Sequence, residues 1–159
     1  MRCAAVTLHP DKPRPQAQRL EFIGALGDGA DVDRLVSWCD SLVLCCELSP
    51  LTQGLLDARR LALMKRSAML VNVARGSVAV EKDLYEALAT GRIAAAALDV
   101  WYEYPEATGE VAMPSQFAFH TLGNVIMSPH SSGWTEAAKR RRLAAMAQTI
   151  NDFAREALS

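Results

Sequence analysis

The chain has 159 residues, and 50% of them are hydrophobic, which supplies enough apolar side chains for one domain core and too few for two. Lysine and arginine number 17 against 18 for aspartate and glutamate, so the net charge is −1. A chain this close to neutrality has no global attraction to nucleic acid or to an anionic membrane, and we expect neither as a partner. The charged fraction of 22% and the aromatic fraction of 6% are typical of a folded globular domain.

The cysteines bear on the compartment and on metal binding. They stand at Cys3, Cys39, Cys45 and Cys46, and no C-x-x-C pair occurs. This pattern predicts free thiols in a reducing compartment and no metal site. No apolar run approaches the roughly 18 residues of a membrane span, and the apolar stretch after Met1 is too short for a secretory signal, so we expect a cytoplasmic protein.

The first half of the chain alternates short apolar runs with turn signals. Prolines at positions 10, 13 and 15 exclude a helix and a central strand between the first two apolar runs. Further on, apolar residues at every third or fourth position indicate helices, and continuous apolar runs indicate buried strands. In chain order we predict a strand at 2–8, a strand at 20–26, a helix at 31–39, a strand at 41–46 and a helix at 52–62.

The second half continues the alternation but contains one long interruption. The stretch 101–123 holds Pro105, Gly109 and Pro114 and has no clean period, which predicts a long loop, and long loops in compact domains tend to carry function. Gly91 provides a C-terminal stop for the helix before it. We predict a strand at 68–73, a helix at 81–89, strands at 93–100 and 124–127, and a helix at 135–158.

The final helix has an apolar and a basic part. Its apolar side chains Leu143, Met146, Ile150 and Phe153 fall three and four residues apart, which predicts a stripe that needs a surface to cover it. The basic run at 139–142 spreads round a helix, so it is more typical of a solvated face than of a nucleic-acid site.

Near-continuous apolar strands that alternate with helices are typical of an α/β fold with a parallel sheet covered on both faces. In such sheets, ligands bind at the carboxyl ends of the strands. The loops to search for chemistry therefore open at Cys46, Val73, Asp99 and Ser128.

Three of these strand ends carry suitable polar residues, namely Arg75, Asp99 and His130. An arginine can clamp a carboxylate with two parallel hydrogen bonds, and a histidine can exchange a proton near neutral pH. Each residue also fits a plainer role: Arg75 a solvated loop cation, His130 a surface turn residue, and Asp99 the end of a strand. The hydrolase motif G-x-S-x-G does not occur.

Three ordered motifs resemble the signatures of the D-isomer-specific 2-hydroxyacid dehydrogenases. They are MKRSAMLVNVARG at 64–76, GRIAAAALDV at 91–100 and NVIMSPH at 124–130. The segment 39–52 is also similar to a strand and loop of that family, so the resemblance covers about residues 1–145. It implies a partial Rossmann-type parallel sheet with flanking helices and a long C-terminal helix.

The resemblance implies an oxidoreductase that transfers a hydride between NAD or NADP and a small 2-hydroxy or 2-keto acid. In it, Arg75 would hold the substrate carboxylate and carbonyl, His130 would exchange the hydroxyl proton, and Asp99 would lie by the nicotinamide carboxamide. The family's remaining cofactor contacts, mostly through the backbone, would fall at Cys46, Thr52, Val73, Ala74 and Gly133. The family's use of the C-terminal region in dimers makes a homo-oligomer possible.

The chain departs from the family at the acid that normally pairs with the catalytic histidine. The acid-proline step of the family is here Tyr104-Pro105, so Tyr104 stands at the usual glutamate position. Glu103 is one residue away and would point to the opposite side in an extended loop. A tyrosine stays neutral up to roughly pH 10 and cannot favour an imidazolium by charge. Two explanations of Tyr104 remain: an altered chemistry or substrate, or an aromatic residue that is simply tolerated there. Formate dehydrogenases of the same superfamily also lack the glutamate, and Asp99-Val100-Trp101-Tyr102 is similar to their sequence at this place.

A second departure is the missing phosphate loop. No G-x-G-x-x-G occurs, and the resemblance aligns Met1 with the second strand of the dinucleotide fold. Because the absent first strand is central in that fold, we expect the strands at 2–8 and 20–26 to separate from the others and leave apolar edges. The residue that would select the cofactor is Thr7, which is neutral, with Arg14 nearby, so NAD and NADP are assigned without preference.

These features divide the chain into an incomplete dinucleotide-binding domain at 1–130 and a C-terminal helix at 131–159 that would return to an absent substrate domain. One hypothesis is a truncated dehydrogenase, which alone would bind a dinucleotide weakly or not at all and turn over no 2-hydroxy acid. The alternative is a non-catalytic fold remnant that acts as a binding or regulatory module.

Overall fold

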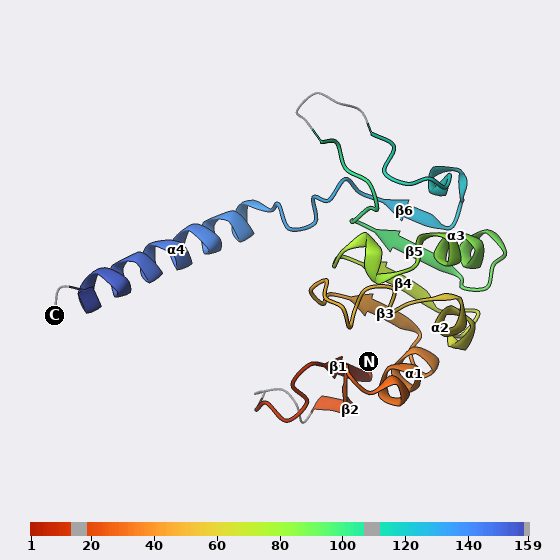
Figure 1. Ribbon diagram of the computed structural model, residues 1–159, viewed down its shortest axis with the longest axis horizontal. Coiled ribbons are helices and arrows are strands. Elements are labelled where there is room, and N and C mark those ends of the chain that lie inside the picture. The colour runs from red at the N-terminus through yellow and green to blue at the C-terminus, as the bar shows by residue number, and fades with distance from the viewer. Residues whose placement is uncertain (14–18, 107–111, 158–159) are drawn as a thin grey trace.

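The computed structural model describes residues 1–13, 19–106 and 112–157. Helices and strands alternate through most of this part of the chain (Figure 1). The elements are β1 (Cys3–Thr7), β2 (Leu20–Ala25), α1 (Gly29–Trp38), β3 (Ser41–Leu44), α2 (Ala58–Leu63), β4 (Met69–Asn72), the 3-10 helix η2 (Gly76–Val78), α3 (Glu81–Ala89), β5 (Ala95–Leu98), the 3-10 helix η3 (Phe119–Thr121), β6 (Val125–Met127) and α4 (Glu136–Ala157).

The strands form two parallel sheets rather than one. β1 pairs with β2, and a second sheet has the order β3-β4-β5-β6. Figure 1 shows β1 and β3 as neighbours across the break between the two sheets. The expected separation of the first two strands from the rest is therefore confirmed, and so is the α/β class.

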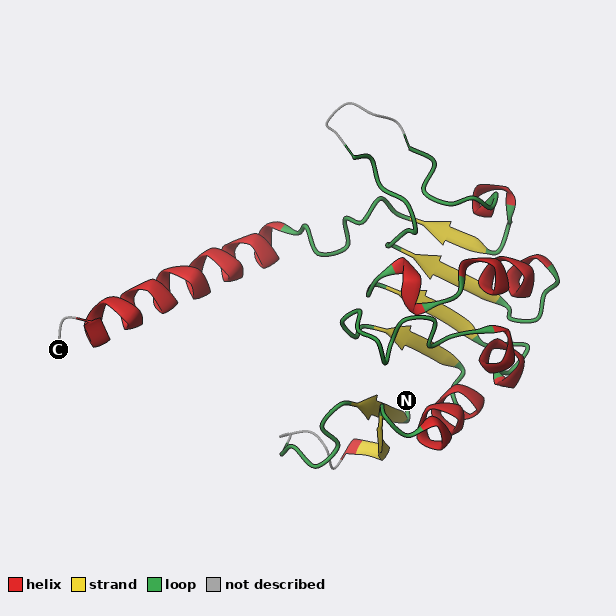
Figure 2. Cartoon of the chain, viewed as in Figure 1, coloured by secondary structure: helices red, strands yellow, loops and turns green. Residues whose placement is uncertain are grey.

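One face of the larger sheet carries the core. Helices α1, α2 and α3 pack in a row along one side of the sheet (Figure 2) and bury alternate strand residues such as Leu42 and Leu70. On the opposite face, Val43 is 53% exposed, Met69 49% and Ile126 73%. The predicted coverage of both faces is therefore wrong for the described residues, because strand side chains alternate and this row of helices reaches only one of the two sets.

The second predicted helix begins later than its apolar spacing suggests. Residues 50–54 form turns, Leu56 makes an isolated bridge to Ala79, and α2 starts at Ala58. Gly54 has a positive φ of 63°, a backbone conformation that ends any helix and that glycine adopts without steric cost. Asp57 then caps α2, its side chain accepting a hydrogen bond from the Arg60 backbone N–H at 2.9 Å. The shift matters because it leaves 47–57 as a loop at the edge where ligands are expected.

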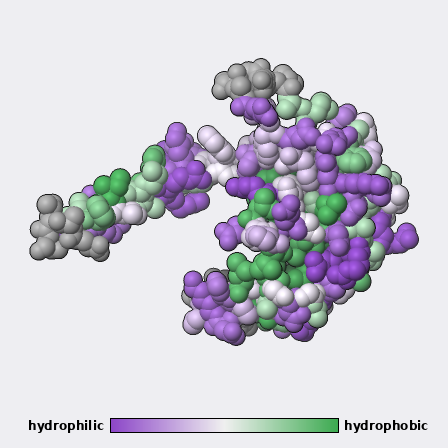
Figure 3. All heavy atoms as spheres, in the orientation of Figure 1, coloured by the Kyte–Doolittle hydropathy of each residue, from purple (hydrophilic) through white to green (hydrophobic). Residues whose placement is uncertain are grey.

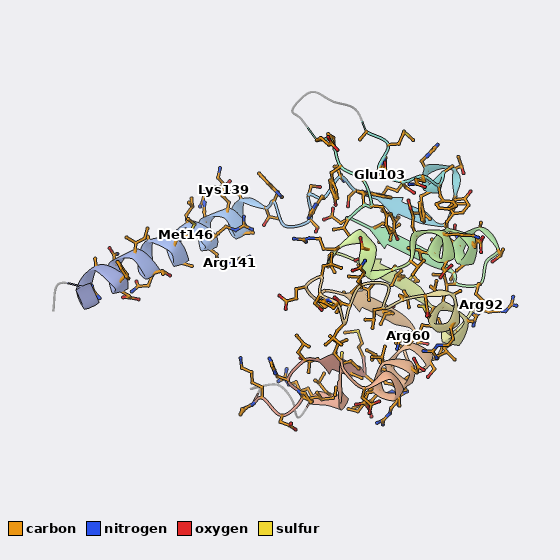
Figure 4. The ribbon with its side chains drawn as sticks, viewed as in Figure 1. Arg60, Arg92, Glu103, Lys139, Arg141 and Met146 are labelled. Carbon is orange, nitrogen blue, oxygen red and sulfur yellow. The ribbon has the colours of Figure 1, made fainter. Side chains whose placement is uncertain are left out.

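Helix α4 extends away from the two sheets (Figure 1). Its described side chains are nearly all exposed, including the predicted stripe of Leu143, Met146, Ile150 and Phe153, and Figure 3 shows apolar surface along it. Lys139 and Arg141 leave the helix on different sides (Figure 4), as expected for a solvated basic run. Among the helices of the described segments, none is both long enough and apolar enough to cross a membrane.

Candidate functional site

The loops after β4, β5 and β6 open at one edge of the larger sheet. The last residues of these three strands lie side by side in the ladder. Arg75 follows β4 by three residues, Asp99 follows β5 directly, and His130 follows β6 by three residues. Because all three strands are parallel and adjacent, the topology brings the arginine, the aspartate and the histidine to the same edge, as the sequence predicts.

Hydrogen bonds to Asn72 and a close approach at Gly76 fix the backbone of the loop that carries Arg75. Asn72 is buried, and its side chain donates to the Arg75 carbonyl at 3.1 Å and accepts from the Ala74 backbone N–H at 3.1 Å. Gly76 lies so close to the next loop that a Cβ on it would fall 2.3 Å from the Trp101 carbonyl oxygen. The Arg75 side chain is exposed apart from one hydrogen bond from Nη1 to the Ala74 carbonyl at 2.7 Å. A fixed backbone thus presents a guanidinium with most of its five donors available.

Asp99 is buried and holds the loop that carries the histidine. One carboxylate oxygen accepts from the Ser128 hydroxyl at 2.5 Å and from the Ser131 N–H at 2.9 Å. The other accepts from the Ser132 hydroxyl at 2.5 Å and from its N–H at 3.0 Å. Burial raises the pKa of the Asp99 carboxyl, but the hydrogen bonds from Ser128, Ser131 and Ser132 outweigh burial and hold the pKa at about 2.

These four hydrogen bonds occupy about all the acceptor positions that a carboxylate has. Asp99 therefore acts in this structure as the anchor of residues 128–132, and the position that the family resemblance gives it beside a nicotinamide stays a prediction. The loop bends at His130, which has a left-handed φ of 56°. Since a non-glycine residue rarely adopts this conformation, the anchoring at Asp99 contributes to holding the imidazole where it lies.

Tyr104 is the hydrogen-bond partner of the histidine. Its hydroxyl lies 3.2 Å from His130 Nδ1 and accepts from the Trp101 backbone N–H at 3.0 Å. Glu103 points elsewhere, because its Oε1 accepts from the Gln116 side chain at 3.1 Å; Figure 4 marks Glu103 in the loop beside β6. The residue at the usual glutamate position thus contacts the imidazole, and the neighbouring acid does not replace it.

The direction of the Tyr104 hydrogen bond follows from its two neighbours. Because the oxygen already accepts from the Trp101 N–H, its own proton is available for His130 Nδ1 when the ring is neutral. That arrangement places the ring proton on Nε2. A hydroxyl can also accept from Nδ1–H, so Tyr104 can support either tautomer, whereas an ionised carboxylate can only accept.

The other predicted cofactor contacts lie at strand ends in both sheets. Thr7 ends β1, Cys46 follows β3, Val73 and Ala74 follow β4, and the exposed Gly133 follows His130. The Thr52 hydroxyl is buried and bonds within its own loop, donating to the Glu47 carbonyl at 2.7 Å and accepting from the Ser49 N–H at 2.7 Å. Arg14, the candidate for NADP selection, lies outside the described residues.

The glycine cluster at 24–29 does not fit a pyrophosphate. The Asp28 side chain accepts from the Ala30 N–H at 2.8 Å, and the Asp31 side chain accepts from the Ala25 N–H at 2.8 Å. Carboxylates therefore take the backbone donors that a phosphate would need, and their charge repels it. The described residues therefore do not supply a phosphate cradle at this cluster.

Several supporting residues escape analysis of the sequence alone. They are Asn72, Trp101, Ser128, Ser131 and Ser132, which brace or anchor the three loops. Trp101 does so by donating from its indole Nε1 to the Ser128 carbonyl at 2.9 Å. The one available signal is position, since each lies within two residues of a predicted site residue at the end of a strand. A pocket of about 430 Å³ lies beside Tyr104, Trp101 and Pro129.

The chain matches known proteins in sequence. The family model "D-isomer specific 2-hydroxyacid dehydrogenase, NAD binding domain" matches residues 3–132. A D-3-phosphoglycerate dehydrogenase of Methanocaldococcus jannaschii is 38% identical over 129 residues, which is 81% of this chain and 23% of that protein. The glyoxylate reductase/hydroxypyruvate reductase of Homo sapiens is 34% identical over 128 residues, 80% of this chain and 36% of that protein.

The fold also has solved counterparts. An NAD-complexed D-isomer-specific 2-hydroxyacid dehydrogenase from Lactobacillus delbrueckii ssp. bulgaricus superposes with a TM-score of 0.78 at 22% identity, covering 98% of this chain and 53% of that one. A relative from Xanthobacter autotrophicus, in complex with NADPH, has a TM-score of 0.61 at 25% identity and covers 82% and 44%. The chain thus spans about half or less of the proteins it matches, and it belongs to the D-isomer-specific 2-hydroxyacid dehydrogenase family, within the NAD-binding domain.

Proposed function

We propose that this chain provides the carboxylate-binding and proton-exchanging part of an NAD(P)-dependent oxidoreductase that acts on a small 2-hydroxy or 2-keto acid. The observation that carries the proposal is the pair of Tyr104 and His130, two strands away from Arg75 at one sheet edge. A cation for a carboxylate and a held imidazole for a proton are the two groups that such a reaction needs from the protein.

Arg75 is the carboxylate-binding residue of the proposal. Its guanidinium is exposed and planar, so it can make two parallel hydrogen bonds to a carboxylate and a further one to an adjacent carbonyl oxygen. The braced backbone of 72–76 fixes where that fork begins. A lysine at this position would present one compact charge and could not reproduce the planar contact.

His130 is the proton-exchanging residue. With Nδ1 facing Tyr104, Nε2 is the atom left for the substrate oxygen. In the doubly protonated ring, Nε2 can give its proton to a forming hydroxyl while Nδ1 keeps its own proton and donates it to the Tyr104 oxygen. Bound NAD or NADP would supply the hydride, and the neutral Thr7 at the end of β1 favours neither of the two.

The proposal concerns a part of an enzyme, and the isolated chain is expected to lack turnover. Carboxylates occupy the amides of its glycine cluster, so a titration with NADH followed by fluorescence should show no micromolar site. A micromolar site would contradict this expectation.

The chemistry can be tested in a chimera. In the human glyoxylate reductase/hydroxypyruvate reductase, the matched segment is replaced by residues 3–132 of this chain, and reduction of glyoxylate by NADH and by NADPH is followed. We expect activity that falls by about 100-fold or more in kcat/KM with Arg75→Lys and with His130→Gln. Arg66→Lys, a change at an exposed turn residue, is the matched control. Equal activity of Arg75→Lys and the control would overturn the role of Arg75.

The tyrosine is tested in the same chimera by Tyr104→Glu. A carboxylate beside His130 favours the imidazolium, whereas a neutral hydroxyl does not. The pH profile of kcat/KM should therefore move to higher pH in the variant. Coincident profiles would show that Tyr104 does not shape proton exchange.

A further inference from the structure

A pocket of about 430 Å³ lies between the long loop that follows β5 and the end of β6. Its walls include the side chains of Trp101, Tyr104, Met127 and three prolines. Neither Arg75 nor His130 lines it, so the pocket is separate from the two groups of the proposed reaction. Its volume falls within the roughly 300–1,000 Å³ that small-molecule sites occupy.

Contacts within the loop hold the walls of this pocket. The Pro114 carbonyl accepts from the Tyr102 N–H at 3.1 Å and from the Glu103 N–H at 3.2 Å. Next along the chain, the Ser115 hydroxyl donates to Oε1 of Glu81, in the first turn of α3, at 2.6 Å. The two sides of the loop are therefore tied to each other and to a helix, and each proline of the lining has a fixed φ. The described part of the pocket is thus preformed.

The side-chain hydrogen-bond donors around the pocket are already engaged. The Trp101 indole donates to the Ser128 carbonyl at 2.9 Å, and the Ser128 hydroxyl donates to Asp99 at 2.5 Å. The Tyr104 hydroxyl lies 3.2 Å from His130 Nδ1. The proline, alanine and methionine side chains of the lining have no donor. A ligand that has to accept hydrogen bonds from these side chains is therefore disfavoured.

Glu103 is the one charged side chain among the described residues that line the pocket. Its Oε1 accepts one hydrogen bond from the Gln116 side chain at 3.1 Å, which leaves most acceptor positions of the carboxylate open. Within the described segments, no lysine or arginine forms an ion pair with it. The pocket therefore joins an unneutralised carboxylate to apolar and aromatic walls, and this charge attracts cations and repels anions.

We propose that this pocket binds a small organic cation that has a flat apolar body and an amidinium or guanidinium head. The planar head can make two parallel hydrogen bonds to the Glu103 carboxylate. The body would lie against the prolines and the Tyr104 ring, whose face attracts a cation. The 2-keto acid and the dinucleotide of the proposed function are both anions, so this ligand occupies a second site, and the inference does not depend on that function.

The test uses this chain and three probes of the same shape: benzamidine, which is a cation near neutral pH, the neutral benzamide, and the anion benzoate. Binding is followed by NMR of ¹³C-labelled methionine methyl groups. Benzamidine should shift the Met127 signal in a saturable way with a dissociation constant of about 1 mM, as expected for a ligand of about nine heavy atoms. Benzamide should bind about tenfold more weakly, and benzoate should give no saturable shift up to about 20 mM. The signal of Met69, an exposed side chain on the open sheet face, should not move.

Two substitutions separate charge from shape. Glu103→Gln removes the charge and keeps the size of the side chain, so it should weaken benzamidine about tenfold and leave benzamide unchanged. Ala112→Phe places a ring in the pocket, which Ala112 lines, and should weaken both probes. Glu86→Gln, at an exposed acid on α3, is the matched control and should bind benzamidine normally.

Circular dichroism confirms that each variant is folded. If a variant does not fold, the order of the three probes and the two methionine signals in the unchanged chain decide alone. The proposal would be overturned by any of four results: no saturable benzamidine shift up to about 20 mM, equal binding of benzoate and benzamidine, an unchanged benzamidine affinity in folded Glu103→Gln, or a shift of Met69 in place of Met127.

Discussion

The edge of β4–β6 and the apolar cavity between β1 and β3 are built in opposite ways. At the first, polar groups satisfy one another: Asp99 accepts four hydrogen bonds, and Asn72 braces the neighbouring loop. At the second, a cavity of about 90 Å³ is lined without charged side chains, and β1 and β3 belong to separate sheets. The contrast indicates that contacts within this chain hold the residues of the first edge, whereas the two sheets do not pair with each other in the described part of the chain.

The close approach of two loops at the first edge should make it intolerant of added volume. A Cβ at Gly76 would lie 2.3 Å from the Trp101 carbonyl oxygen and 2.6 Å from its carbon, and these are backbone atoms that cannot rotate away. Gly76→Ala should lower the free energy of unfolding by about 3 kcal/mol, measured by urea denaturation. Gly133→Ala, where a Cβ meets nothing within 4 Å, should change it by less than about 0.5 kcal/mol. Similar losses of unfolding free energy in Gly76→Ala and Gly133→Ala would contradict the expected difference between the crowded and the open glycine.

The anchor at Asp99 should stabilise the chain in a pH-dependent way. Lowering its pKa from 3.8 to about 2 corresponds to about 2 kcal/mol of stability. Since the folded pKa is the lower one, this contribution is complete above about pH 4 and is lost as the pH falls toward about 2. Asp99→Asn should therefore cost about 2 kcal/mol at pH 7, and the difference from the parent chain should shrink below pH 4.

Glu103→Gln serves as the control for Asp99→Asn. Glu103 is exposed and accepts one side-chain hydrogen bond, so its loss should cost less than about 0.5 kcal/mol at pH 7. A difference between parent and Asp99→Asn that stayed constant from pH 7 to pH 2.5 would show that the carboxylate charge is not what holds residues 128–132.

The two regions should also differ in local stability. β1 pairs with β2 alone, whereas β4 and β5 each have a strand on both sides, and edge elements open before the whole domain unfolds. Native-state hydrogen exchange should therefore give amides of β1, such as that of Ala5, an opening free energy lower than that of Leu98 by about 1.4 kcal/mol or more, a factor of ten in rate. Equal opening free energies would mean that β1 is no less stable than the centre of the larger sheet.

Much of this difference between the two regions was predictable from the sequence, because short apolar runs indicate where each strand ends. The apolar runs before Val73, Asp99 and Ser128 place these residues at strand ends, and parallel topology then places them at one edge. Helix α3 matches its predicted bounds of 81–89, because Gly91 and the apolar spacing both mark it. The separation of the two sheets agrees with the expectation from the family resemblance.

The remainder depends on contacts between distant segments, which a single sequence does not display. The four hydrogen bonds to Asp99 come from residues about thirty positions away, and nothing local distinguishes an anchoring aspartate from one that contacts a ligand. The predicted start of the helix at 52–62 was wrong, because the positive φ of Gly54 overrode an apolar spacing that suits a helix, and α2 begins only at Ala58. The sequence does not reveal that one sheet face is exposed, because an apolar strand has the same composition whether one or both of its faces are covered.

The smallest effect is expected at Tyr104, where the edge of β4–β6 reaches solvent. Tyr104→Phe removes the hydroxyl that joins His130 Nδ1 to the Trp101 N–H. The side chain is 46% exposed, so water can replace these hydrogen bonds, and the free energy of unfolding should fall by about 0.5 kcal/mol.

The protonation of the two ring nitrogens of His130 gives a more specific measurement of the role of Tyr104. In ¹⁵N NMR of the neutral ring, the Nε2–H tautomer should dominate in the parent chain and lose part of its excess in the variant. An unchanged tautomer ratio would mean that the phenol does not orient the imidazole, and that the edge holds its histidine through Asp99 alone.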